Sequence, residues 1–459
     1  MAQASAKRAP QTLSDDDANG ELVDEDAAGA VLRRAPFSDN PRVGVRGLRS
    51  QQRILDAALQ VFGEVGYHQC GVIRITEVAG CSRASFYQYF SSKEDVFREL
   101  AGDVARQLMT STDALDPIGP DAAGWKSLRA WVDRHAAIYS ANEPVFQAFQ
   151  AAAASDEAIA SGSARIAARQ VRAIRAKLSG TALPPRHLDA VLDLALSGVT
   201  RSHRFCDVLG AAVPGATLPT GRVYDALTDV IHRTLFGLVD GVNVRKAPAR
   251  RLGHVRSRTA LLESLQSGGA PSDLSPTGQR TLETLLVAAH EVLVTRGYFG
   301  TRVDDITAAA GVSHGAFYRY FENKDHVIRV LALRAMQRVA TAFDEIPDLA
   351  GQSAPQRSTS LRRWLRRYAS TAASEAAMIR VWVDATIDDP LQGLESAAAV
   401  DWGRSRLVRV LQPRGFGDVD TEALLLVVLL DALGAHRRSP EVIEAAALVI
   451  ERGLLGFPD

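Results

Sequence analysis

The first hundred residues contain one long amphipathic segment followed by two shorter ones. Apolar side chains recur at three- and four-residue spacing over 54–62, which is the period of a helix with one buried face. Gly66 is expected to end this helix. A second helix is predicted over 73–79 and stops at Gly80, and Ser82 is of the residue type that caps the start of a third. Two short helices joined by a glycine-containing turn predict a helix-turn-helix, whose second helix enters the major groove of DNA.

This pattern occurs twice. When the sequence is aligned with itself at an offset of 231, 20 of 46 positions between Leu55 and Leu100 are identical to their partners between Leu286 and Leu331. The similarity continues at an offset of 233. After an insertion of about 14 residues (207–220) in the first copy, it resumes at an offset of 219. An internal repeat of this length decides the architecture, because each copy is then one domain-sized unit. The chain is predicted to be all-α, with two tandem units of the same ancestry.

Composition and motif spacing together suggest six segments. We expect a disordered tail (1–45), a first helix-turn-helix domain (46–95) and a first larger helical domain (96–240). An Arg-rich linker (241–276), a second helix-turn-helix domain (277–326) and a second helical domain (327–459) follow. The linker and Arg42, Arg46, Arg49 and Arg53 could serve as basic arms that reach DNA, or simply as solvated segments.

Charge and cysteine content exclude several classes of protein. The formal net charge is zero, so a uniformly basic coat is absent and DNA affinity has to come from local patches. Three scattered cysteines are too few for a zinc quartet or a disulfide framework. No apolar run approaches the length of a membrane span, and we expect a cytoplasmic protein without a metal or other cofactor.

The two helix-turn-helix segments resemble the DNA-binding segment of the tetracycline-repressor (TetR) family. The resemblance rests on ILDAALQVFGEVGY and ITEVAGCSRASFYQYFSSKEDVF in the first copy, and on LLVAAHEVLVTRGYFGTRVDDITAAAGVSHGAFYRYFENKDHVI in the second. It implies DNA contacts, mostly to phosphates, for Tyr87, Tyr89, Lys93, Tyr318, Tyr320 and Lys324. One tyrosine of each pair could instead belong to the core. The family usually carries a threonine pair before the second helix, of which the second copy keeps Thr301, whereas the first has Cys70 and Gly71.

The start of each recognition helix predicts the base contacts. These positions hold Arg83, Ala84 and Ser85 in the first copy, and His314, Gly315 and Ala316 in the second. Arginine can donate two hydrogen bonds to guanine, worth about 1–3 kcal/mol of discrimination, whereas histidine is a weaker candidate and alanine offers only a methyl contact. Because the two sets differ, we expect an asymmetric double-stranded DNA operator.

The resemblance also implies a dimer and an effector. Members of single length pair through their last two helices, so the closing helices of the two copies are expected to pair within one chain as a pseudo-dimer. The family's helical domains enclose an apolar pocket, which predicts a small hydrophobic effector. Candidate lining residues are Trp131, His135, Tyr139, Phe146, Phe149, Trp364, Tyr368 and Trp382, with an ordinary helical core as the alternative.

Two other functions compete with a ligand-responsive repressor. An enzyme is disfavoured, because the sequence holds no nucleophile–base pair, HExxH motif or glycine-rich loop. The second alternative is a regulator in which one reader is vestigial and serves as a partner-binding module. Gly315 and Ala316 would make the second copy the degenerate one.

Overall fold

The computed structural model describes residues 45–212, 220–245, 274–385, 390–435 and 439–458. The predicted tail and most of the predicted linker lie outside these residues. Within them the chain is helical and contains no strand, only an isolated bridge between Ile118 and Leu178. The all-α prediction is therefore confirmed for the part of the chain that is described. None of these helices is long and apolar enough to cross a membrane.

In its described residues the first copy contains nine helices. They are α2 (Val45–Gln69), α3 (Val72–Ala79), α4 (Arg83–Tyr89), α5 (Lys93–Asp113), α6 (Ala122–Ala141), α7 (Glu143–Ser155), α8 (Glu157–Ala176), α9 (Pro185–Ala212) and α10 (Thr220–Phe236). Helix α2 kinks at Gly66, whose φ of 70° lies in the left-handed region. The predicted helix end at Gly66 is thus a sharp bend, because glycine adopts this conformation without a Cβ penalty.

The second copy repeats this order with one fusion of helices. Its elements are α12 (Pro276–Arg296), α13 (Val303–Ala310), α14 (His314–Tyr318), α15 (Lys324–Asp344), α16 (Ala354–Ala385), α17 (Pro390–Leu411), the 3-10 turn η1 (Gln412–Arg414), α18 (Val419–Ala435), α19 (Pro440–Leu448) and the π-helical turn η2 (Val449–Leu454). Helix α16 spans the positions that α6 and α7 occupy in the first copy.

A proline explains the difference. Pro144 stands at the start of α7, where its ring and missing N–H end the preceding helix. The position related to it by the repeat is Ala377, which continues α16 without interruption. As a result α7 turns beneath α2 in the first copy, and a Cβ at Gly63 would lie 3.2 Å from the Pro144 ring.

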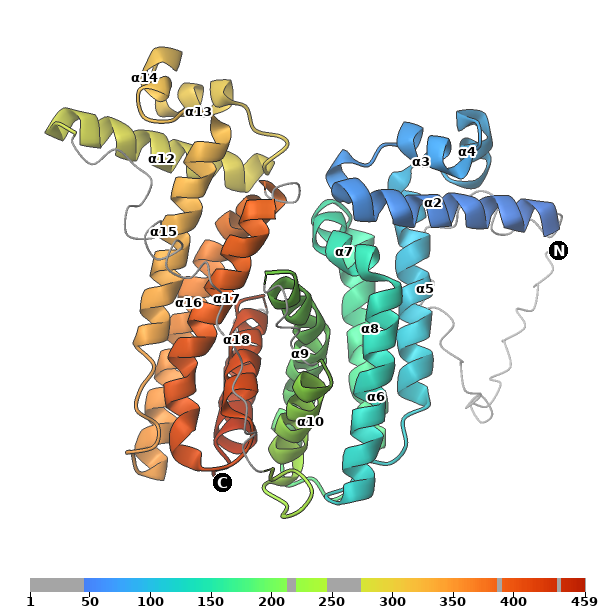
Figure 1. Ribbon diagram of the computed structural model, residues 1–459, viewed down its shortest axis with the longest axis vertical. Coiled ribbons are helices and arrows are strands. Elements are labelled where there is room, and N and C mark those ends of the chain that lie inside the picture. The colour runs from blue at the N-terminus through green and yellow to red at the C-terminus, as the bar shows by residue number, and fades with distance from the viewer. Residues whose placement is uncertain (1–44, 213–219, 246–273, 386–389, 436–438, 459) are drawn as a thin grey trace, which may run out of the picture.

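The last helices of the two copies meet in the middle of the molecule (Figure 1). Helix α9 packs against α18 and α19, and α10 packs against α18 and η2. One continuous apolar core runs through this region, from Val191 and Leu227 of the first copy to Leu426 and Ile450 of the second. Burial of apolar surface is the main stabilising contribution of such a core. The two helix-turn-helix units lie together at the opposite end of the view from the C-terminus (Figure 1).

Candidate nucleic-acid interface

The two helix-turn-helix units share the same backbone construction. In the first, Gly80 ends α3 in the left-handed conformation, and the Ser82 side chain caps α4 by accepting a hydrogen bond from the Ser85 N–H at 3.1 Å. In the second, Gly311 ends α13, and Ser313 accepts from the Ala316 N–H at 3.3 Å. We call α2–α4 the first reader and α12–α14 the second reader. The caps and glycine turns predicted from sequence are present in both.

The aromatic residues of the recognition helices divide into core and surface. The four phenylalanines of these segments are fully buried: Phe86, Phe90, Phe317 and Phe321. Tyr87 and Tyr318 are about half exposed, at 49% and 55%. In contrast, Tyr320 is buried and Tyr89 is partly buried. The geometry therefore favours Tyr87 and Tyr318 as the tyrosines able to reach DNA.

Lys93 and Lys324, the first residues of α5 and α15, each bind the reader of their own copy. The Lys93 ammonium donates to the carbonyl oxygen of Tyr67 at 2.8 Å and lies 4.6 Å from the centre of the Tyr67 ring. Lys324 repeats this with Tyr298, at 2.8 Å and 3.9 Å. Burial lowers the pKa of Lys324. Both lysines thus hold the turn that follows the first helix of the reader, and phosphate contact stays a prediction for them.

Thr301 is also engaged within the protein. Its side chain is buried, and its hydroxyl donates to the carbonyl oxygen of Gly297 at 2.8 Å. Cys70, at the same position of the first copy, is buried and makes no comparable hydroxyl bond. The hydroxyl that distinguishes the two copies here therefore stabilises the reader's own turn.

The predicted base-reading positions are accessible but chemically different. Arg83 and Ala84 are exposed and Ser85 is partly buried in the first reader. His314 and Gly315 are exposed and Ala316 is partly buried in the second. Their places in the fold are equivalent, so the difference between the readers lies in side-chain chemistry.

An acidic residue accompanies the second recognition helix. The His314 ring bonds the Asp304 carboxylate of α13 through Nε2, and Asp304 is itself largely exposed. The position related to Asp304 in the first reader is Ile73, which is 55% exposed. A carboxylate beside the recognition helix repels DNA phosphates, so the second reader has the less favourable electrostatics.

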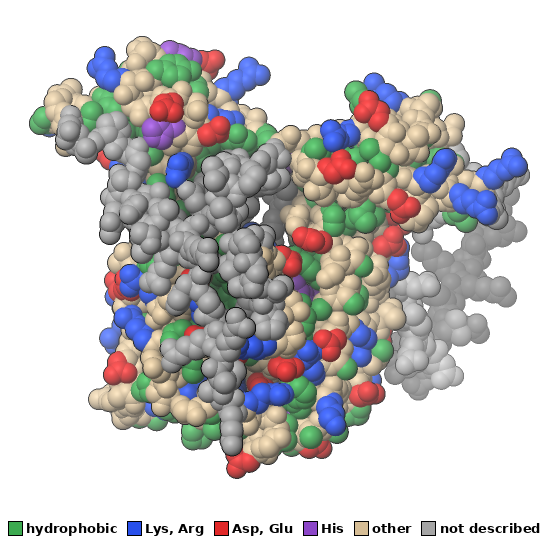
Figure 2. All heavy atoms as spheres, viewed as in Figure 1, with side chains coloured by type: hydrophobic (Ala, Val, Ile, Leu, Met, Phe, Trp, Pro, Cys, Tyr) green, Lys and Arg blue, Asp and Glu red, His purple; other side chains and the backbone are tan. Residues whose placement is uncertain are grey.

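Sequence reasoning missed further exposed side chains on the recognition helices. Gln88 and Arg319, one on each copy, are both exposed. Basic side chains also gather at the outer end of α2 (Figure 2), where Arg46, Arg49 and Arg53 are exposed. These arginines are the described part of the predicted basic arms. Arg42 and the linker arginines from Arg250 onward lie outside the described residues.

Comparison with known proteins bears on the same segments. Residues 54–100 and 285–331 both match the family model described as bacterial regulatory proteins, tetR family. Both readers match this family over their helix-turn-helix segments. The chain thus carries two tandem TetR-type segments, as the repeat and the motifs predicted.

Curated relatives match over part of their length. The uncharacterized HTH-type transcriptional regulator YdgC of Bacillus subtilis is 39% identical over 70 residues, covering 15% of this chain and 36% of the relative. The HTH-type transcriptional repressor AcnR of Corynebacterium glutamicum is 29% identical over 113 residues, covering 23% and 58%. The regulator EthR of Mycolicibacterium smegmatis is 28% identical over 115 residues, covering 25% and 52%. The chain spans between about a third and three fifths of these relatives.

The predicted effector-binding residues of the first copy form a buried aromatic cluster. Trp131, His135 and Tyr139 are almost fully buried along α6. The His135 ring stacks on His203 at 5.7 Å and bonds the Thr200 hydroxyl at 3.1 Å, and Tyr139 packs on Phe146 at 4.8 Å. Burial lowers the pKa of His135 to about 3.

The remaining candidates are distributed over separate clusters. Phe149 packs at the edge of the first reader's core. Trp364 and Tyr368 pack against each other with tilted rings within the central core, where the Trp364 ring N–H donates to the Ala342 carbonyl oxygen. The side chain of Trp382 lies outside the described residues. Among the described candidates, none lines the apolar cavity between the two copies.

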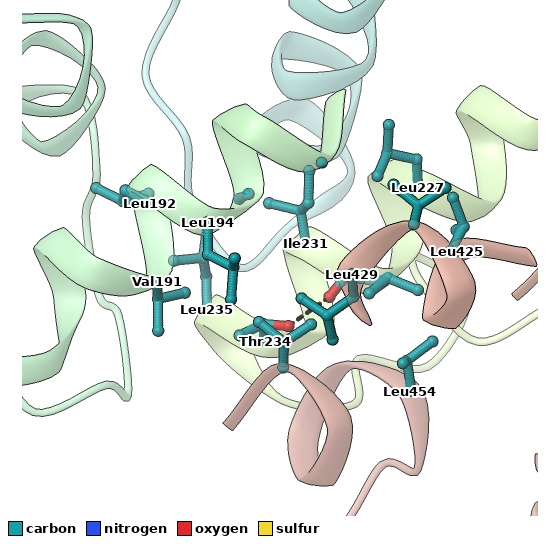
Figure 3. Close-up of a pocket in the computed structure, with 15 residues that line it drawn as sticks. Val191, Leu192, Leu194, Leu227, Ile231, Thr234, Leu235, Leu425, Leu429 and Leu454 are labelled. Carbon is teal, nitrogen blue, oxygen red and sulfur yellow. Dashed lines mark hydrogen bonds between the residues drawn. The ribbon is translucent and has the colours of Figure 1, made fainter. Parts of the chain in front are cut away.

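A small apolar cavity lies between the two copies (Figure 3). It is lined by α9 and α10 of the first copy and by α18 and η2 of the second, including Leu194, Gly198, Ile231, Leu429 and Leu454. Its volume is about 40 Å³. Pockets for drug-sized ligands measure roughly 300–1,000 Å³, so this space is a packing void in the arrangement described. Among the described residues, no group of three or more His, Cys, Asp or Glu side chains is placed to hold a metal ion.

Proposed function

We propose that this chain is a sequence-specific DNA-binding transcription regulator that acts as a single-chain pseudo-dimer on an asymmetric operator. In this proposal residues 46–95 and 277–326 read DNA, and residues 96–240 and 327–459 form the joined helical domains. Repression is the mode we favour, since the relative AcnR is named a transcriptional repressor. DNA binding rests on two TetR-type readers that lie at the same end of the molecule (Figure 1).

One reciprocal pair of hydrogen bonds carries the pseudo-dimer. Arg233 and Arg452 occupy the same position of the repeat, at an offset of 219, as do Thr234 and Gly453. The Arg233 Nε donates to the carbonyl oxygen of Gly453 at 2.7 Å. Conversely, the Arg452 Nε donates to the carbonyl oxygen of Thr234 at 3.0 Å. A contact that is repeated with its partners exchanged is the signature of a two-fold interface, here formed within one chain.

Further charged contacts join the copies at positions that the repeat does not share. Arg222 of α10 binds Asp418, with one hydrogen bond of 2.8 Å, and Arg201 of α9 pairs with Asp431 of α18. The counterpart of Asp431 in the first copy is Gly198. Such one-sided pairs favour the union of these two halves over the pairing of two identical ones, which supports a covalent pseudo-dimer.

Size measurement and footprinting test this proposal. Light scattering of the purified chain should give the mass of one chain, and DNA selected from a random pool should bind one chain per site with two unlike half-sites. A palindromic selected site occupied by two chains would contradict the single-chain arrangement. Failure to enrich any sequence would contradict DNA recognition itself.

A second candidate function follows from the second reader. Two features of the second reader support a regulator in which it contributes little to base recognition and binds a partner instead. His314 is bonded to Asp304, and Gly315 has no side chain to contact a base. Arg83→Ala and His314→Ala distinguish the two functions. If both readers act, each variant should weaken binding, and Arg83→Ala should do so about 5- to 150-fold, the equivalent of 1–3 kcal/mol. An effect of Arg83→Ala alone favours the vestigial second reader.

An effector is part of the proposal. A small apolar molecule that binds one arrangement of the helical domains better than another would shift the separation of the readers. The side chains around Trp131, His135 and Tyr139 are closely packed, so a ligand there would have to open α6 from α9. Apolar compounds that bind the chain should raise its melting temperature. If none of these compounds weakens operator binding, release of DNA by an effector is contradicted.

A further inference from the structure

A pair of aromatic residues that the repeat relates to each other joins the two readers. His68 follows the kink in α2, and Phe299 follows the end of α12. They are related by the offset of 231, so each is the other's counterpart in the repeat. Their ring centres lie 5.4 Å apart with the planes inclined at 40°. A residue that contacts its own counterpart lies on the two-fold axis of an isologous pair.

Each ring projects from a well-anchored turn. Gly66 and Gly297 have the same φ of 70°, which bends the chain sharply before the contact residue. Tyr67, next to His68, is buried against the first reader's core. The matching Tyr298 is fixed by its hydroxyl, which donates to Asp325 at 2.9 Å.

The trailing lysines reinforce both turns. As described above, Lys93 and Lys324 bind the carbonyl oxygens of Tyr67 and Tyr298, immediately before His68 and Phe299. Lys93 also approaches the His68 carbonyl oxygen at 3.4 Å. Because these turns are held in place, a contact between their rings limits how far one reader can move relative to the other.

We propose that His68 and Phe299 act as positioning residues that set the separation of the two readers and thereby the spacing of the half-sites. This inference rests on the proposed DNA-binding function. Two recognition helices that bind one face of DNA must enter grooves about one helical turn apart, roughly 34–36 Å. A contact on the axis between the readers limits their rotation on the long helices α5 and α15. It therefore favours some spacings of the half-sites over others without contacting a base.

Fusion of the copies allows this particular pair. In a homodimer the axial residue must face an identical residue, and two histidines would repel each other once protonated. In one chain the position can hold two different residues, and a histidine against a phenylalanine avoids that conflict. Aromatic pairs of this kind are worth a factor of about 2 to 12 in equilibrium terms, which is the size of effect to look for.

Operators of altered spacing test the inference. The DNA selected by the wild-type chain is resynthesised with one or two base pairs added to or removed from its centre, and affinities are measured for wild type, His68→Ala and Phe299→Ala. We expect each variant to bind the best spacing within about threefold of wild type. The penalty for a wrong spacing should shrink by about 2- to 12-fold. Lys126→Ala, at an exposed position of α6 outside both readers, should leave the wild-type profile unchanged.

Three results would overturn the inference. These are an unchanged spacing profile in both variants, an equal loss at every spacing, and a gain at every spacing, which would make the contact a block to DNA. A chain carrying His68→Cys and Phe299→Cys provides a readout without DNA, since a short bifunctional maleimide should bridge the pair within one chain, as peptide mapping would show. Absence of that bridge also contradicts the contact. If wild type selects no DNA while the bridge forms, the proposed function fails and the contact stands.

Discussion

Replacing Arg233 with leucine tests the junction between the copies most directly. Arg233 is completely buried in α10, and its guanidinium donates hydrogen bonds to Glu422 at 2.7 Å, to the Gly453 carbonyl oxygen at 2.7 Å and to the Asn243 carbonyl oxygen at 3.2 Å. It also lies over the Phe416 ring at 5.2 Å. The substitution removes a charge that joins the two copies while leaving its partners in place.

The expected loss follows from these partners. Removing one member of a buried ion pair typically costs about 3–5 kcal/mol, because the remaining polar groups lose their compensation. Glu422 retains Arg414 at 2.6 Å, which limits the penalty on the carboxylate. The carbonyl oxygens of Gly453 and Asn243 lose this donor, at about 1–3 kcal/mol for a buried group left unsatisfied. We therefore expect Arg233→Leu to lower stability by about 3–5 kcal/mol.

Arg452 supplies a matched control inside the same molecule. It makes the reciprocal bond to the Thr234 carbonyl oxygen and is nearly as buried. The counterpart of Glu422 on its side is Asp189, which is half exposed and pairs with Arg175 instead. Arg452→Leu removes the hydrogen bond to the Thr234 carbonyl oxygen, at about 1–3 kcal/mol for a buried acceptor left unsatisfied.

Hydrogen exchange and urea denaturation measure the difference. Protection of the amides in α10 and α18 reports the free energy of opening at the junction, even where the whole chain does not unfold in one step. Arg233→Leu should lower that protection and the urea midpoint more than Arg452→Leu does. Equal effects, or a loss below about 1 kcal/mol for Arg233→Leu, would refute the buried-pair reasoning.

Two further predictions concern the helical domains. Gly198→Ala should stabilise the chain by about 1–2 kcal/mol in urea denaturation, because it adds about 1 kcal/mol of helix propensity and fills part of a void worth about 1 kcal/mol. A Cβ there meets no atom within 4 Å, whereas Gly124→Ala should destabilise, since its Cβ would lie 2.2 Å from the Gly119 carbonyl oxygen. His135 has its pKa lowered to about 3 by burial, with a further contribution from His203, so its stabilising contribution is complete above about pH 6.5 and declines as the pH falls toward 3. The stability of wild type relative to His135→Gln should therefore drop by about 2 kcal/mol between about pH 6.5 and pH 5, and a pH-independent difference would contradict this.

Local signals made the readers predictable. Gly80, Ser82 and the buried Phe86 act through contacts within a few residues, so their roles can be inferred from sequence spacing. The roles of Lys93 and Thr301 could not be inferred in this way. Both side chains bind carbonyl oxygens of a turn whose shape depends on the packing of α2 or α12, and sequence alone does not contain that geometry.

Features that depend on long-range packing were harder to predict from the sequence for the same reason. The fusion of α6 and α7 into α16 could be anticipated from the loss of Pro144, because proline acts locally. The π-helical turn η2 and the cavity beside it depend on how two copies pack, which no single copy specifies. The candidate effector residues illustrate the limit. A helical spacing of aromatic residues predicts burial, and burial is what Trp131 and Trp364 have, but it does not predict an open pocket.

Duplication within one chain removes a constraint that a homodimer cannot escape. In a homodimer every interface residue must suit two equivalent environments at once, so a change that improves one contact also alters its symmetric copy. Here Glu422 joins Arg233 in the buried centre while its counterpart Asp189 remains at the surface, and Arg83 faces solvent where His314 binds Asp304. The reciprocal backbone bonds of Arg233 and Arg452 retain the two-fold geometry, because the helices still have to pack in register. Divergence is therefore concentrated in side chains whose environment is unique to one copy, which is where an asymmetric operator would require it.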